Sequence, residues 1–296
     1  MNKNKSWQKL KNEYLGRGFS TFCGLLIVVL TLTIIGFVAF KGLSTFIING
    51  YSLSEFLFNK TWKPDADTPQ FGASIFIIGS TLVSIGSVII AAPVGIALAV
   101  FMNLISPKLG IKVLQPAMEL FVGIPSVIYG WVGISVLLPL IKKVYGGVGF
   151  SLLAGIIVLT IMILPTITSI SSDAIKTIPR EYLEASYGLG ATRWHTIIKV
   201  AIPAAKNGIS TGVVLGLARA FGEALAVQMV IGNSIKIPKG IVDTTTTLTS
   251  VLTMDMANTI FGTEWNNALW SMALLLLVMS FIFILIIRAI GKRGEI

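Results

Sequence analysis

Arg219 and Glu223 call for a chemical explanation because they lie four positions apart inside a long apolar stretch. An arginine near the middle of a membrane-spanning helix costs roughly 2.5–3.5 kcal/mol, so its side chain must face a partner, a wet cavity or a substrate. The guanidinium stays charged, and its planar fork binds tetrahedral oxyanions at two points. If the stretch is one continuous helix, the spacing puts both side chains on one face, where they can pair.

Two interpretations of this pair stay open. In the first, Arg219 and Glu223 form a structural ion pair that fixes helix packing. In the second, Arg219 presents positive potential to a passing oxyanion, and Glu223 weakens the binding so that the ion is released. A ridge of small residues at every fourth position lies beside the pair and predicts close approach of a second helix. The ridge consists of Gly208, Gly212, Gly216 and Ala220.

A second group of candidate functional residues lies in the polar segment 171–206, which we call the knob. Pro179 can open a helix, and Gly188 and Gly190 offer a turn before a second helical pattern begins. The knob is therefore expected to form two short helices around a glycine hinge. Its apolar side chains are ringed by charge, which suits docking into a groove on another protein. These apolar anchors are Tyr182, Leu183 and Tyr187.

The composition shows what kind of protein positions these residues. Hydrophobic residues make up 54% of the chain and charged residues only 12%, about half of the ~25% charged residues in soluble domains. This excludes a soluble α/β enzyme. A helix needs ~20 apolar residues to cross a bilayer. Six stretches reach that length and predict an all-α integral membrane protein: 19–40, 73–102, 114–140, 150–170, 207–231 and 268–287.

The net charge of +10 is explained by topology rather than by nucleic-acid binding. Basic residues collect in the loops on the cytoplasmic side of membrane proteins. Of the 23 basic residues, 15 lie on the side of the two termini, seven on the other side, and Arg219 lies within a span. Both termini are therefore expected to be cytoplasmic, with no nucleic-acid partner.

The expected domain boundaries follow from this topology. The first 18 residues form a basic cytoplasmic segment, in which 7–15 is either an interfacial amphipathic helix or a solvated tail. The transmembrane domain takes up most of the chain and includes the knob. The remaining boundaries are 19–290 for this domain, 41–72 and 232–266 for its outer loops, and 291–296 for a cytoplasmic C-terminal tail.

The knob carries a recognisable signature. Glu184-Ala185-Ser186, then Gly190 after three residues, then Val200-Ala201-Ile202-Pro203 after nine more, resembles the EAA motif of ABC importer permeases. Ser186, Val200 and Ile202 depart mildly from the usual residues. The resemblance implies that the knob is the coupling helix that sits in a cleft of the ATP-hydrolysing subunit. It assigns coupling roles to Glu184, Ala185, Ser186, Gly190 and Pro203. The alternative is an ordinary amphipathic loop.

Further runs narrow the resemblance to the PstC-type permeases of phosphate importers, rather than the PstA-type. They are 123–130, 164–165 with 172–174, 188–194, 219–223 and 226–233. The resemblance implies six transmembrane helices in the MetI-like permease fold and a bacterial or archaeal plasma membrane. The implied partners are a PstA-like permease, two copies of a PstB-like ATPase, a PstS-like extracytoplasmic phosphate-binding protein and membrane lipid.

The expected function is the permease subunit of an ATP-driven importer of inorganic phosphate, with Arg219 and Glu223 in the substrate path. No catalytic residue, metal or cofactor is expected in this chain, because it has no G-x(4)-G-K-[ST] motif and one histidine, His195. ATP and Mg would be bound by the partner ATPase. The alternatives are a permease for sulfate, molybdate or phosphonate, or an ion-gradient-driven secondary transporter, which predicts inverted repeats.

Overall fold

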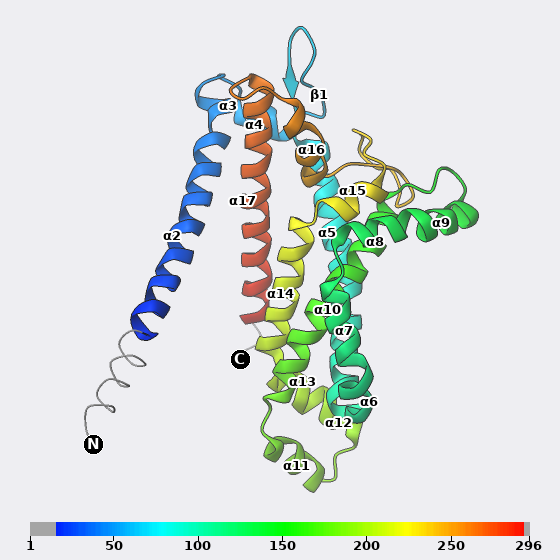
Figure 1. Ribbon diagram of the computed structural model, residues 1–296. Helices are drawn as coiled ribbons and strands as arrows, with labels where there is room; N and C mark the ends of the chain where they lie inside the picture. The colour runs from blue at the N-terminus through cyan, green and yellow to red at the C-terminus, as the bar shows by residue number, and fades with distance from the viewer. Residues whose placement is uncertain (1–15, 293–296) are drawn as a thin grey trace.

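The computed structural model describes residues 16–292 and shows a bundle of long helices (Figure 1). The predicted segment at 7–15 and the last four residues lie outside this part of the chain. Four helices are unbroken spans, whose apolar composition and length match the bilayer. They are α2 (Gly16–Gly42), α5 (Ser74–Val100), α10 (Leu152–Lys176) and α17 (Glu264–Lys292). A π-helical turn, η2 (Phe101–Ile105), extends α5.

The third predicted span, 114–140, is not a single straight helix. It consists of η3 (Gly110–Leu114), α7 (Gln115–Gly123), α8 (Ser126–Val132), η4 (Gly133–Leu137) and α9 (Leu138–Tyr145). The chain is extended at Ile124, with ψ 125°, because the ring of Pro125 disfavours the helical conformation of the preceding residue. After this break, α8 and α9 turn across the bundle axis and project from it (Figure 1).

The fifth predicted span, 207–231, is also broken. Helix α14 (Lys206–Gly222) ends at Gly222, and the short helix α15 (Leu225–Ile231) follows two residues later. Before α14, the chain bends by 70° from the segment 193–204. Among residues 16–292, five helical segments are long and apolar enough to cross a membrane, and a sixth is obtained when this bent pair counts as one span.

Helix α10 lies at the centre of the packing, between α5, α14 and α15. The predicted small-residue ridge of α14 packs against it. A Cβ on Gly216 would lie 2.6 Å from Ile167 Cγ1, and one on Gly208 would lie 2.3 Å from the Cβ of Ala174. Both distances are too short for any side chain, so the ridge is needed for the two backbones to approach this closely. The prediction of a close helix partner is confirmed.

One end of the bundle carries an outer cap. It contains α3 (Ser44–Ile47), α4 (Leu53–Phe58), the antiparallel pair β1 (Trp62–Lys63) and β2 (Gln70–Phe71), and α16 (Leu248–Asp255) with η6 (Met256–Asn258). The Tyr51 hydroxyl donates to Glu264 Oε2 at 2.9 Å. Burial, together with this hydrogen bond and the charge of Glu264, raises the pKa of Tyr51 to about 12.

The opposite end carries α6 (Pro107–Leu109) and the knob. The knob contains α11 (Arg180–Gly188), α12 (Arg193–Thr196), η5 (Ile197–Ala201) and α13 (Ile202–Ala204). Helix α10 continues to Lys176, so the knob leaves the bundle a few residues later than the predicted start at 171. The beginning of α2 and the end of α17 lie toward this same end (Figure 1).

Candidate functional site

The knob forms the two predicted helices around a glycine hinge. Gly190 has φ +80°, a backbone conformation that glycine adopts without strain, and its N–H donates to the Tyr187 carbonyl at 2.9 Å. Thr192 caps α12 by accepting from the His195 N–H at 3.3 Å. The glycine therefore reverses the chain, and the threonine starts the next helix.

Ser186 and Thr196 hold the two knob helices together. Their hydroxyl oxygens lie 2.9 Å apart, and both side chains are buried. Ser186 is a position where the sequence departs from the EAA pattern. The departure has a structural reason, because an alanine here would leave the buried Thr196 hydroxyl without this partner.

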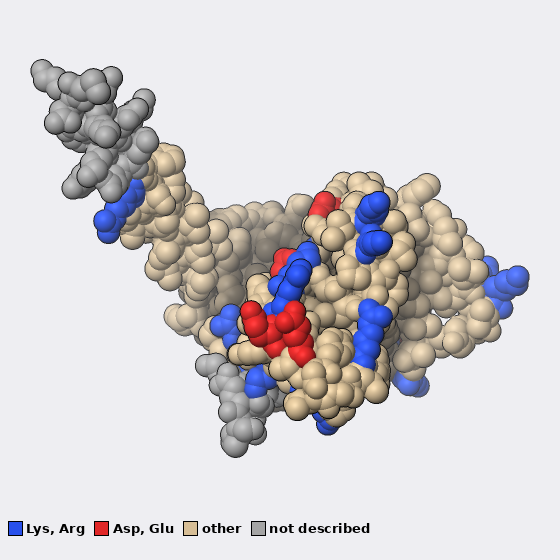
Figure 2. All heavy atoms as spheres, turned by 90° about the horizontal axis from the view of Figure 1, so that it is seen from below, with Lys and Arg blue, Asp and Glu red and all other residues tan. Residues whose placement is uncertain are grey.

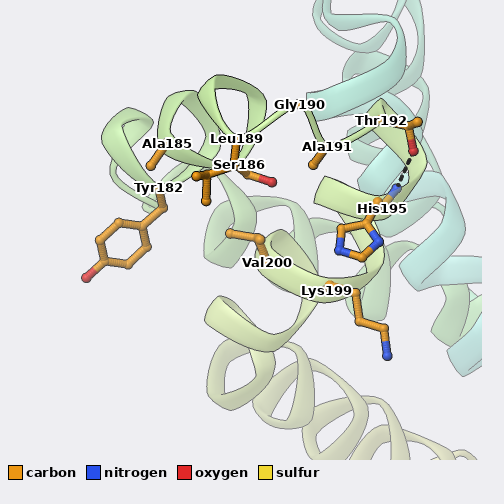
Figure 3. Close-up of a pocket in the computed structure, with 10 residues that line it drawn as sticks. All are labelled: Tyr182, Ala185, Ser186, Leu189, Gly190, Ala191, Thr192, His195, Lys199 and Val200. Atoms are coloured by element: carbon orange, nitrogen blue, oxygen red, sulfur yellow. Dashed lines mark hydrogen bonds between the residues drawn. The ribbon is translucent and has the colours of Figure 1, made fainter.

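An open groove of about 750 Å³ lies between the knob helices (Figure 3). Three of the predicted coupling residues, Ala185, Ser186 and Gly190, line it. Glu184 lies exposed on α11, and Pro203 lies in the first turn of α13. The groove is lined by Tyr182, Ala185, Ser186, Leu189, Gly190, Ala191, Thr192, His195, Lys199 and Val200.

Large apolar side chains stand exposed on the knob. Leu189 is 90% exposed, Trp194 is 63% exposed and Tyr182 is 56% exposed. Viewed from this end, acidic residues gather near the middle of the face, with basic residues around them (Figure 2). An apolar patch with a charged rim is typical of a protein-binding surface. The geometry therefore suits docking of a partner protein.

Arg219 lies in the last turn of α14 rather than in the middle of a span. Its Nη1 donates to Thr166 Oγ1 on α10 at 3.0 Å. Helix α8 carries the hydroxyl of Tyr129. That hydroxyl donates to the Phe121 carbonyl at 2.7 Å and so bridges the break between α7 and α8. The partly buried guanidinium therefore joins the last turn of α14 to the middle of α10.

Glu223 does not pair with Arg219, and the prediction that both lie on one helix face was wrong. Glu223 is extended, with ψ 125°. Its Oε1 accepts from the Ala226 N–H at 3.1 Å and caps α15. Its backbone carbonyl accepts from Thr249 Oγ1 at 2.9 Å. Since α14 ends at Gly222, the i, i+4 rule for a continuous helix does not apply here.

Sequence reasoning missed a cluster of hydroxyl groups beside Glu223. A small cavity of about 10 Å³ is lined by Glu223 and by hydroxyl side chains from α5 and from the start of α16 and the residue before it. Ser80 Oγ accepts from the Leu248 N–H at 2.8 Å and ties the two elements together. The signal was the hydroxyl-rich run 244–250. The hydroxyl residues of this lining are Ser80, Ser84, Thr247 and Thr249.

Residues 91–295 match the family described as "Binding-protein-dependent transport system inner membrane component". The chain is 53% identical to the "Probable ABC transporter permease protein YqgH" of Bacillus subtilis, over 96% of this chain and 93% of that protein. It is 34% identical to the "Phosphate transport system permease protein PstC" of Mesorhizobium japonicum, over 90% and 86% of the two chains.

Solved structures share the fold. A permease chain in the crystal structure of a bacterial alginate ABC transporter, in complex with its alginate-bound periplasmic protein, has a TM-score of 0.64 at 15% identity and covers 97% of both chains. A chain of the inward-facing MetNI methionine ABC transporter has a TM-score of 0.56 at 19% identity, over 75% of this chain and 97% of that chain. At these identities the likeness concerns architecture alone, and it agrees with the predicted MetI-like fold.

Proposed function

We propose that this chain, which belongs to the family of binding-protein-dependent transport system inner membrane components, is the permease subunit that conducts inorganic phosphate in an ATP-driven importer. Family membership makes it a multi-pass plasma-membrane protein and a permease subunit of an ABC importer. Such a subunit is not itself catalytic and works with an ATPase and a substrate-binding protein. This decides against an ion-gradient-driven secondary transporter.

The observation that carries phosphate as the substrate is the similarity to phosphate permeases over most of the chain. In addition to the relative described above, a relative in Methanocaldococcus jannaschii is named "Probable phosphate transport system permease protein PstC" and is 30% identical over 90% of this chain. Arg219 supplies chemistry that suits this substrate, because a guanidinium binds a tetrahedral oxyanion at two points and keeps its charge at any physiological pH.

In this proposal Arg219 is the residue that attracts the oxyanion in the substrate path. Thr166 holds one edge of the guanidinium through its hydroxyl, which leaves its other donors for the ion. Glu223 is proposed to act in the same path by holding α15 and α16 in place. Phosphate would then pass the fixed positive charge of Arg219, next to the break between α14 and α15. This break would let α15 move between an open and a closed arrangement of the substrate path.

The proposed complex contains a second, PstA-like permease, two PstB-like ATPase subunits and a PstS-like phosphate-binding protein. The apolar surface of α8 and α9 supports packing against the second permease, because Val132, Val136 and Leu140 line an open apolar groove of about 470 Å³. The knob groove would receive the ATPase, which binds ATP and Mg. ATP-driven closure of the ATPase pair would move the knob and thereby switch the access of the path.

The test is transport by the reconstituted complex. The four kinds of subunit are placed in liposomes, and ATP-dependent uptake of radiolabelled phosphate is measured with sulfate, molybdate or phosphonate as competitors. Phosphate uptake that only unlabelled phosphate suppresses supports the proposal. Uptake of another oxyanion, with no phosphate uptake, would assign the permease to that ion instead.

A further inference from the structure

Arg193 ties the knob to a distant part of the bundle. It is the first residue of α12, and its Nη2 donates to the backbone carbonyls of Leu104 and Ile105, the latter at 2.7 Å. These two carbonyls belong to η2, the turn that closes α5. The hydrogen bonds join residues 88 and 89 positions apart in the chain. They connect the groove-forming loop directly to the end of a membrane span.

The chemistry of this contact explains why the residue is an arginine. The last carbonyls of a helix have no intrahelical donor, and the C-terminal end of a helix favours a positive charge. Beyond η2 the chain leaves the helix at Ser106, and Pro107 has no N–H to offer. The guanidinium supplies both a donor and a positive charge to this end of α5.

The end of α5 is connected onward to the centre of the bundle. Asn103 Nδ2 donates to Ser172 Oγ on α10 at 2.8 Å and to the Ala99 carbonyl at 2.7 Å. On the knob side, the Ser186–Thr196 contact joins α11 to the helix that carries Arg193. Polar contacts thus run from the groove through α12 and η2 to α10, beside a buried apolar cluster that contains Ile197, Ala99 and Val100.

We infer that Arg193 is a positioning residue that transmits displacement of the knob to α5 during transport. The inference rests on the proposed function, because it needs an ATPase that moves the knob. Without the Arg193 contact, the knob would still dock, and the ATPase would still hydrolyse ATP. The displacement of the knob would not reach the end of α5, so ATP hydrolysis would proceed with little phosphate transport.

The experiment measures the ratio of phosphate uptake to ATP hydrolysis in liposomes that hold the whole complex. Arg193→Met keeps the aliphatic stem and removes the donors. We expect it to lower the ratio about tenfold, the order of a lost hydrogen bond to a charged group, while the ATPase still copurifies. Arg193→Lys, which keeps the charge and a donor, should recover part of the ratio. Lys112→Met is the matched control, because it removes an exposed cation from η3, which follows η2 and α6 in the chain.

The outcomes separate this inference from the proposed function. If the unaltered complex neither recruits an ATPase nor takes up phosphate, the proposed function fails. If it transports and Arg193→Met keeps the full ratio, the role of Arg193 is overturned. If Arg193→Met fails to assemble, a Cys23→Ser chain with cysteines replacing Arg193 and Ile105 decides. A higher ratio after cross-linking the two cysteines supports the role, and an unchanged ratio overturns it.

Discussion

The knob exposes apolar side chains, whereas the Arg219–Glu223 region encloses polar ones. At the knob, apolar side chains such as Leu189 and Trp194 stand in the open. At the joint between α14 and α15, polar side chains are enclosed, and Glu223 and Thr249 are bonded to neighbouring segments. An exposed apolar patch indicates a missing protein partner. An enclosed polar cluster must be satisfied within the chain or by an ion that passes through.

This difference also separates the two chemical tasks of a permease. The exposed anchors of the knob can be changed without disturbing the bundle, since the groove is open and a side chain such as Leu189 is 90% exposed. The joint is built from α5, α10, α14, α15 and α16, so a change there affects several elements at once. Substitutions in the two regions should therefore give different combinations of lost binding, lost transport and lost stability.

The largest effect is expected at Arg219. We predict that Arg219→Ala lowers phosphate uptake by about two orders of magnitude, as for removal of one donor aimed at a negative charge, while assembly with the ATPase is unchanged. Radiolabelled uptake and copurification measure the two quantities. Arg288→Ala, which removes an exposed arginine from α17, is the matched control. Normal uptake by Arg219→Ala would remove this residue from the substrate path.

The next effect is expected at the glycine hinge of the knob. Gly190→Pro forces φ from +80° to about −65° and removes the N–H that bonds to Tyr187. A proline in an incompatible conformation costs about 3 kcal/mol. If the docked knob needs the native turn, this cost weakens ATPase binding roughly 100-fold. Gly188→Ala is the control, because a Cβ at this helical position meets nothing within 4 Å. Equal binding by the two variants would show that the hinge is not needed for docking.

A smaller effect on the same surface is expected at Leu189. Leu189→Ser should weaken ATPase binding about tenfold, as for an anchor that loses 1–2 kcal/mol of contact energy. The thermal midpoint of the isolated subunit should stay the same, because the side chain is 90% exposed. A fall in this midpoint would mean that Leu189 packs within the chain and would weaken the contrast between the two regions.

Glu223 tests whether the joint needs a charge or only an acceptor. Glu223→Gln keeps an oxygen that can accept from the Ala226 N–H, so uptake should fall less than about threefold, the effect of losing a few tenths of a kcal/mol. Glu223→Ala loses the cap and should cost about 1 kcal/mol of stability. Thermal unfolding and uptake are measured on both variants. If Gln is as harmful as Ala, the negative charge itself has a role in transport.

The smallest effect is expected in the outer cap, which serves as a reference region. The pKa of Tyr51 is raised to about 12 in the folded protein, above its ordinary value of about 10. The protonated hydroxyl therefore stabilises the cap fully below pH 10, and this contribution is lost as the pH rises from 10 to 12. Tyr51→Phe should lower the stability of the cap by about 1 kcal/mol. It should also make the fall in stability between pH 10 and 12 smaller, and hydrogen exchange in the cap measures both effects.

Local patterns were enough to predict the knob. Its helices, its glycine turn and its exposed anchors depend on residues close together in sequence, and the structure confirms the helices and the turn. The apolar length of the spans likewise predicted α2, α5, α10 and α17, with each end within six residues of its observed position. The third and fifth spans were predicted as continuous because apolar composition reports burial in lipid and not whether a helix is unbroken.

The sequence by itself determined that this chain is a helical membrane protein with a docking loop, because apolar length and local helix and turn signals are properties of short segments. Only the tertiary structure decided where the charged groups point. Glu223 bonds to Ala226 and Thr249 instead of Arg219, and Arg193 reaches carbonyls 88 and 89 positions away. Such partners are set by how distant segments pack, which residue spacing along one helix cannot express.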